Sequence, residues 1–430
     1  MRATTIGVRV SEESAVRNGD RHGTKLPVGR IGWSLAVAVL VVASATAQES
    51  PKAPGPWIPK PEKPPTTSGR CLVPAGEPIE AETILESLRE GTNVDLQGKI
   101  IEGNLDADHF WGAAGERTSS LRVVRGSLRL DSCRVTGHFG FPRTVFVQDV
   151  VFSCTELGGD LDLTDSEVRG SLLADRAHVA GDVRLTNARF GKDLSFRKAA
   201  LKGRLDMSGA RLFGVNLQEC EIERSLDLSG SIAGTTDLSL AKIGGPVKLS
   251  DTLLLGAFTA RDATFGRAVT LSSVSSSNSI DIGGSSVAGD LSLADLSVER
   301  NLVLPESFGG SVDLATVAVG HDLSLMGGVF LDMRINGLTV RDTSDLQRGK
   351  YGGKLEIFDS DFGKTFVATG ARFNGPCEFR KVRFPGADPL AGAKFAFSPT
   401  LIETRLPRPP TVAPGTDPEP EPEGSANEKP

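Results

Sequence analysis

The sequence is poor in the residues that build metal centres and large irregular cores. Among 430 residues there are one Tyr, three Trp, four Met and five His. The histidines are scattered, with no H-x-x-x-H pair and no acidic companion at ligand spacing, and no cysteine spacing resembles a zinc site. The calcium-binding G-G-x-G-x-D pattern is also absent. We therefore predict no metal site, no bound cofactor and no catalytic residue.

Charge excludes other classes of protein. The formal net charge is −6, and acidic and basic residues are mixed throughout. This balance offers no basic stripe for nucleic acid and no dense acidic surface. We therefore predict no nucleic-acid partner and no partner recruited by charge alone.

The N-terminal end has the order of a signal peptide. A polar, Arg-containing stretch precedes an apolar run at residues 31–42, and small residues follow at 45–47. The run is shorter than the roughly 20 residues that span a membrane, so we predict a signal peptide over residues 1–47 and an exported protein. An uncleaved membrane anchor is the alternative.

Both ends of the remaining chain are rich in proline. Residues 48–70 are predicted to be an extended linker, and residues 407–430 an acidic Pro/Glu tail. The tail has too few apolar residues to offset the entropy of folding, so we predict that it is disordered.

The sequence between these ends repeats G-x-L-x-L-x-x-(small)-x-(large apolar) every eleven residues. The first apolar position falls regularly at Leu128, Phe139, Val150, Leu161, Leu172, Val183, Leu194 and Leu205, and the register holds to Cys377 apart from a polar Ser344. Residues two apart point to the same side of a strand, so each apolar pair predicts one short strand.

Two such units, roughly 22 residues, predict one coil with four short sides. Stacked coils bury each inward pair against the same positions above and below. The fold class is therefore an all-β solenoid over residues 94–384, a right-handed, four-sided parallel β-helix of about 12 coils.

The repeat resembles the pentapeptide-repeat family, whose A-(D/N)-L-x-x units build a four-sided right-handed β-helix. The segments "ADLSV" at residues 294–298 and "GDVRL" at residues 181–185 look like its small-acidic-apolar cores. Here the units read as five plus six residues, as in looser members of the family. Some relatives imitate duplex DNA and bind topoisomerases, which the resemblance makes a candidate function.

Solenoid ends need covers. Residues 80–90, within an N-terminal cap at 71–93, place Ile84, Leu85 and Leu88 on one face of a short helix, and Gly91 follows as its C-cap. Residues 109–120 interrupt the register and predict a side loop. At the other end, we predict a C-terminal cap over residues 385–406.

The place of a cysteine or an aromatic residue in the repeat predicts whether its side chain is buried. Cys133, Cys220 and Cys377 fall at inward positions and predict buried thiols, whereas Cys71 and Cys154 pair only if the cap folds back beside the early coils. Tyr351 and Leu346 fall inward, so we expect them in the core. The candidate partner contacts are two residues of the predicted side loop: Phe110 and Trp111.

Aspartates recur before and between the apolar residues of a pair. They predict either a carboxylate set of the kind a carbohydrate-active β-helix uses, or simply turn and surface residues, which Asp favours. The short loops favour the second interpretation.

We predict a non-enzymatic, exported structural or interaction module with an unknown protein or cell-envelope partner. The alternatives are a topoisomerase-binding DNA mimic and a carbohydrate-active β-helix. End-to-end or dimeric association is compatible with the rod, and contact with a membrane is expected only if the signal peptide is uncleaved.

Overall fold

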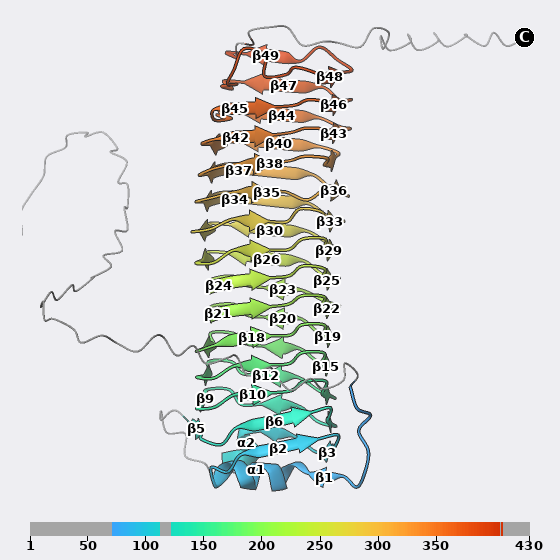
Figure 1. The fold of residues 1–430 in the computed structure, drawn as a ribbon, viewed down its shortest axis with the longest axis vertical. Coiled ribbons are helices and arrows are strands. Elements are labelled where there is room, and N and C mark those ends of the chain that lie inside the picture. The colour runs from blue at the N-terminus through green and yellow to red at the C-terminus, as the bar shows by residue number, and fades with distance from the viewer. Residues whose placement is uncertain (1–70, 112–121, 405, 407–430) are drawn as a thin grey trace, which may run out of the picture. The chain divides into compact units, whose positions relative to one another are not determined.

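Short parallel strands stack into one rod (Figure 1). The computed structural model describes residues 71–111, 122–404 and 406. The predicted signal peptide, Pro-rich linker and acidic tail, and all but the start of the interruption at 109–120, lie outside the described residues. No helix of the described residues has the length and apolar character needed to cross a membrane.

One coil shows how the eleven-residue unit folds. It contains β12 (Leu161–Asp162), β13 (Glu167–Val168), β14 (Leu172–Leu173) and β15 (His178–Val179). Leu161 then pairs with Val183 in the next coil, in parallel register. The predicted four-sided parallel β-helix is confirmed.

Each of the four strands of a coil belongs to its own ladder. The ladder that contains β12 is called the first side; it runs from β4 (Leu105–Asp106) to β49 (Thr400–Ile402). The second side includes β5 (Arg122–Val124), and the third includes β2 (Val94–Gln97). The fourth side runs from β1 (Ile79–Glu80) to β48 (Lys394–Phe395).

The rod is longer than the repeat count indicated. It has about 14 turns, where about 12 were predicted. At the C-terminal end, Phe373 pairs with Phe395 and Phe379 with Leu401, so the ladders continue past residue 384. The predicted separate cap at 385–406 is therefore largely a further coil, because inward apolar positions recur there at the ordinary spacing of 22 residues.

Tight corners separate the strands. Corner residues recur with the repeat in the left-handed backbone region, for example Asp165 (φ 58°), Arg176 (φ 58°) and Asn187 (φ 57°). Asp and Asn tolerate this region better than most residues. Behind such a corner the chain turns back: the N–H of Ser166 donates to the carbonyl of Leu163. This explains why polar residues, rather than glycine alone, are sufficient at the corners.

The inward positions form one continuous core. Tyr351 and Leu346 are buried, as predicted. Buried free thiols occupy the three predicted inward positions Cys133, Cys220 and Cys377. Along the fourth side, five rings stack in successive coils at centroid distances of 5.0, 4.9, 4.7 and 4.5 Å: Phe308, Phe330, Tyr351, Phe373 and Phe395.

The predicted capping helix is α1 (Ala81–Arg89), which buries Ile84, Leu85 and Leu88. Gly91 ends it with φ 76°. The N–H of Gly91 donates to the carbonyl of Leu88, and that of Thr92 to the carbonyl of Ser87, which satisfies carbonyls that a helix end leaves unpaired. The helix closes the first coil and so covers its strand edges.

A second helix, α2 (Ala107–Trp111), follows β4 directly. The prediction of a side loop starting at residue 109 is therefore wrong for His109 to Trp111. The reason is Asp106, whose carboxylate accepts the backbone N–H of His109 at 2.8 Å and caps the helix start.

Candidate functional site

Of the two predicted contact residues, Phe110 lies in the core and not on an exposed loop. Its side chain is 2% exposed, and its ring meets that of Phe141 edge-on at 5.8 Å. The short helix α2 turns the ring inward, which the loop prediction did not anticipate. The prediction that Phe110 is an exposed contact is therefore wrong, while the side chain of Trp111 lies outside the described residues.

Beside Phe110, a carboxylate lies between two imidazoles. The Nδ1 atom of His109 is 2.8 Å from Asp106 Oδ1, and the Nε2 atom of His138 is 3.1 Å from Oδ2. The side chain of Asp106 is 10% exposed, against 58% for His109 and 42% for His138. These two histidines, and His321 through Asp342 Oδ2 at 3.0 Å, thus each have an acidic hydrogen-bond partner, which the sequence did not predict.

The two histidines lower the pKa of Asp106. Burial alone raises the pKa of this carboxyl, but hydrogen bonds from the His109 backbone and imidazole outweigh it, and the charges of His109 and His138 add to them. The pKa of Asp106 is thus below its ordinary value of 3.8. The carboxylate is ionised at neutral pH and accepts hydrogen bonds.

Pairing between the first two coils of the first side brings these residues together. Leu105 pairs with Phe139, so Asp106 lies beside Gly140. Asn104 likewise lies beside His138, and its Oδ1 accepts the His138 N–H at 3.2 Å across 34 residues of sequence. An ordinary coil spans 22 residues, as from Leu161 to Val183; the extra length matches the interruption at residues 109–120.

These residues border a hollow of about 680 Å³ on the outside of the first side. Gly140 belongs to its lining but is itself buried, with the His138 ring beside the place that a Cβ atom would occupy. A Cβ atom built at Gly140 would meet His138 Cδ2 at 3.2 Å and Asp106 Cβ at 3.7 Å. The lining includes the following residues: Asn104, Asp106, His109, His138, Gly140, Pro142, Gly159, Asp160, Asp162 and Arg184.

The far wall of the hollow belongs to the next coils. Asp160 Oδ2 is 2.7 Å from Arg184 Nη1, and its Oδ1 accepts the N–H of Asp182 at 2.8 Å. These bonds outweigh the effect of burial, which raises the pKa of Asp160, and leave that pKa below its ordinary value. Asp162 Oδ1 accepts both the N–H and the hydroxyl of Thr164, at 2.9 and 2.7 Å.

Outside the hollow, the recurring aspartates serve the backbone. Asp206, Asp227 and Asp237 each accept the N–H of the serine two residues later, at 2.8 to 3.1 Å. Such short local bonds are typical of aspartate at turns. The interpretation of these residues as turn and surface groups therefore fits their contacts.

Within residues 71–111, 122–404 and 406, no group of three or more His, Cys, Asp or Glu side chains is arranged to hold a metal ion. The Asp106 carboxylate and its two imidazoles are instead bonded to one another.

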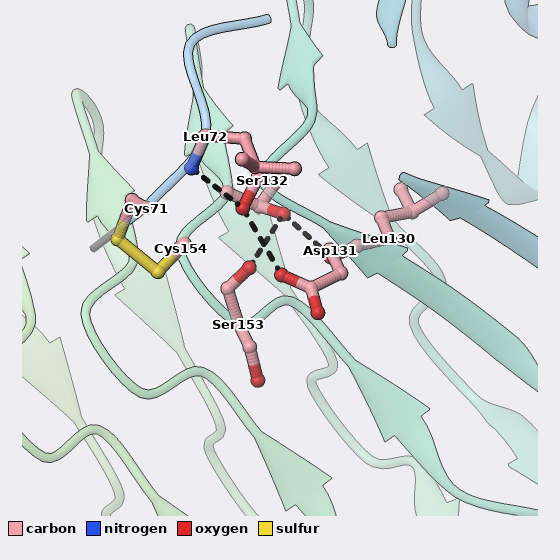
Figure 2. Close-up of a disulfide and its surroundings, with 8 residues drawn as sticks. Cys71, Leu72, Leu130, Asp131, Ser132, Ser153 and Cys154 are labelled. Atoms are coloured by element: carbon pink, nitrogen blue, oxygen red, sulfur yellow. Dashed lines mark hydrogen bonds between the residues drawn. A yellow bond between two sulfur atoms is a disulfide. The ribbon is translucent and has the colours of Figure 1, made fainter. Parts of the chain in front are cut away.

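A disulfide joins Cys71 to Cys154, with a Cα–Cα distance of 5.4 Å (Figure 2). The N–H of Leu72 donates to Ser132 Oγ at 3.2 Å, so the segment ahead of α1 lies along the early coils. Cys154 occupies a left-handed corner, with φ 56°. The pairing thus arises in the way considered from the sequence, by folding back of the cap segment.

A signal for the Asp106 cluster was present in the sequence. Subtracting the interruption at residues 109–120 from the spacing of Leu105 and Phe139 leaves one coil, which places Asp106 beside Gly140.

In comparisons with known proteins, the chain matches no protein-family model and no curated protein. Membership of the pentapeptide-repeat family stays a prediction.

Proposed function

We propose that the protein is an exported, non-enzymatic module that presents the rigid faces of a β-helix to a partner in the cell envelope. The observation that carries the proposal is the disulfide between Cys71 and Cys154. Disulfides persist in oxidising compartments and are rare in the cytosol. The bond agrees with the signal-peptide pattern at residues 1–47.

The pKa values of two carboxyl groups in the hollow weigh against catalysis. Glycoside hydrolysis needs a carboxyl group that stays protonated near neutral pH, so that it can donate to the leaving group. Asp106 and Asp160, which line the hollow, both have pKa values below the ordinary value. Neither carboxyl is suited to act as that acid, which weighs against the carbohydrate-active enzyme.

The DNA-mimic alternative has less support. Imitation of duplex DNA requires a continuous negative surface. Here residues of opposite charge pair across neighbouring coils at several places, as in the ion pairs Lys202–Glu223 and Lys242–Glu221 (N···O 2.7 Å in the second). Such pairs cancel charge along the rod.

The proposal is tested by fractionating host cells that express the full chain with a C-terminal epitope tag. We expect the chain in the envelope or outside the cell, starting after Ala47, with Cys71 and Cys154 protected from an alkylating reagent until reduction. A matched Cys71→Ser chain should leave Cys154 reactive. Recovery of the uncleaved wild-type chain in the cytoplasm, with both thiols reactive, would contradict the proposal.

A further inference from the structure

We propose that the hollow over Gly140 binds a neutral, hydroxyl-rich ligand, namely a short carbohydrate segment. The inference rests on the proposed function only in that export brings the rod to such a ligand. The binding site itself is argued from the residues of the hollow, whose volume of about 680 Å³ falls in the range of about 300–1,000 Å³ common for ligand sites.

The hollow exists because one outward row of the rod is interrupted. This row holds the residues that pair with Gly140 above and below it on the first side. At every other described position of this row, the residue has a side chain that extends beyond its Cβ atom. These residues are Asp106, Asp162, Arg184, Asp206, Asp227, Lys248, Thr270, Ser292, Asp313, Arg334, Glu356, Glu378 and Thr400.

The gap has a definite size along the rod. Neighbouring strands lie about 4.8 Å apart, so the backbones of Asp106 and Asp162, two rungs apart with Gly140 between them, are separated by roughly 10 Å. Carboxylates therefore stand on both sides of Gly140, which is itself buried next to the His138 ring. A ligand in the hollow beside the His138 ring meets acceptors at both ends.

The polar groups around the gap suit hydroxyls. Asp162 uses only Oδ1 for Thr164 among the described residues, which leaves Oδ2 as an acceptor. His109 and His138 are half-exposed, and imidazole can donate or accept. A sugar hydroxyl does both, so it can use carboxylate, imidazole and guanidinium partners together, while Pro142 supplies an apolar contact.

Charge balance in the hollow selects a neutral ligand over an ion. Asp106 is already bonded to His109 and His138, and Asp160 to Arg184. A phosphate would meet the carboxylates of Asp106, Asp160 and Asp162, and a cation would have to break existing pairs. A polyol adds hydrogen bonds without removing any, and so avoids leaving a partly buried charge unpaired.

The test is isothermal titration of the purified mature chain with cellotetraose, maltotetraose and N,N′,N″,N‴-tetraacetylchitotetraose as probes. We expect at least one to bind with 1:1 stoichiometry. Gly140→Val fills the gap and should weaken that binding by at least about tenfold, whereas Thr270→Val, on the same row but outside the hollow, should bind as the wild type does. Asp162→Asn should weaken binding about tenfold through one charged hydrogen bond.

A second variant, Gly140→Ala, keeps the test valid if Gly140→Val does not fold, because it adds only one methyl group. It should fold with a wild-type circular dichroism spectrum and bind more weakly than wild type. Binding of none of the three sugars would overturn the inference, as would equal binding by folded Gly140→Val. Binding of inorganic phosphate or Zn²⁺ at the hollow in place of sugar would also overturn it. These outcomes are independent of fractionation, so the inference can fail while the proposed function holds.

Discussion

Aromatic rings pack differently on the fourth side of the C-terminal coils and in the core of the first coils. At the C-terminal end, Phe330, Tyr351 and Phe373 stack nearly parallel, with interplanar angles of 10° and 15°. At the N-terminal end, Phe139 meets Phe152 at 72°. Rings at equivalent positions of successive coils stack, whereas rings at different positions of the coil meet edge-on, as Phe362 and Phe366 also do at 70° in the C-terminal coils.

The difference bears on where a ligand site can form. In the C-terminal coils, each residue lies over its equivalent in the next coil. In the first two coils, the interruption before residue 121, the helix α2 and the glycine at 140 break that equivalence. The hollow and the disulfide both lie between these coils and the ones that follow directly. Four variants test this comparison, from the largest expected effect to the smallest.

The largest effect is expected from Phe139→Ala. Phe139 is fully buried and its ring lies 4.8 to 6.3 Å from those of Phe141, Phe146 and Phe152. Its truncation should lower the free energy of unfolding by about 3–5 kcal/mol. Hydrogen exchange should show the loss in the first coils, with Phe373→Ala as a matched control that loosens the other end. Equal loosening of both ends by Phe139→Ala would contradict local unfolding.

Removing the disulfide should have the next largest effect. The bond closes a loop with a sequence separation of 83, and Cys71→Ser should cost about 2–4 kcal/mol, mostly through a freer unfolded chain. Thermal melts with hydrogen exchange are the measurement. Cys220→Ser, at a buried free thiol in a regular coil, is the control for the loss of a sulfur atom. If the amide hydrogens of residues 122–157 were as well protected from exchange in Cys71→Ser as in the wild type, the disulfide would not stabilise these coils.

Asp106→Asn keeps a side chain that can cap α2 but removes the negative charge that faces His109 and His138, and it should cost about 0.5–1.5 kcal/mol at neutral pH. Because the folded pKa of Asp106 is lowered, its stabilisation is fully present above its ordinary pKa of 3.8 and lost as the pH falls through the lower folded value. The difference in melting temperature between wild type and variant should therefore shrink below that pH. Asp227→Asn, which removes the charge of an aspartate that accepts a local backbone N–H and has no histidine in its hydrogen bond, is the matched control. A constant difference down to pH 2 would show that the histidine pairing is unimportant.

The smallest effect, and the only gain, is expected from Tyr351→Phe. The Tyr351 hydroxyl is buried without a hydrogen-bond partner among the described residues, and burial, then the charge of Asp345, raises its pKa. Phenylalanine occupies this position in the adjacent coils as Phe330 and Phe373. The variant should be about 1 kcal/mol more stable in thermal melts. A loss of stability would mean that the hydroxyl has a partner.

The sequence predicts the regular coils better than the irregular first coils. The period of eleven predicts the inward residues because every unit repeats the same local pattern, and the apolar face of residues 80–90 predicts the capping helix. It does not predict the pairing of Cys71, since that depends on the path of a segment outside the repeat. The meeting of Asp106 with His138 depends on a register across an insertion, which the repeat alone does not determine.

The most direct test of the central claim, that the site lies where the repeat breaks, is a crystal structure of the wild-type protein grown with the three tetrasaccharides. The account predicts sugar density over Gly140, between Asp106 and Asp162. Density only on the regular coils, or an empty hollow, would contradict it.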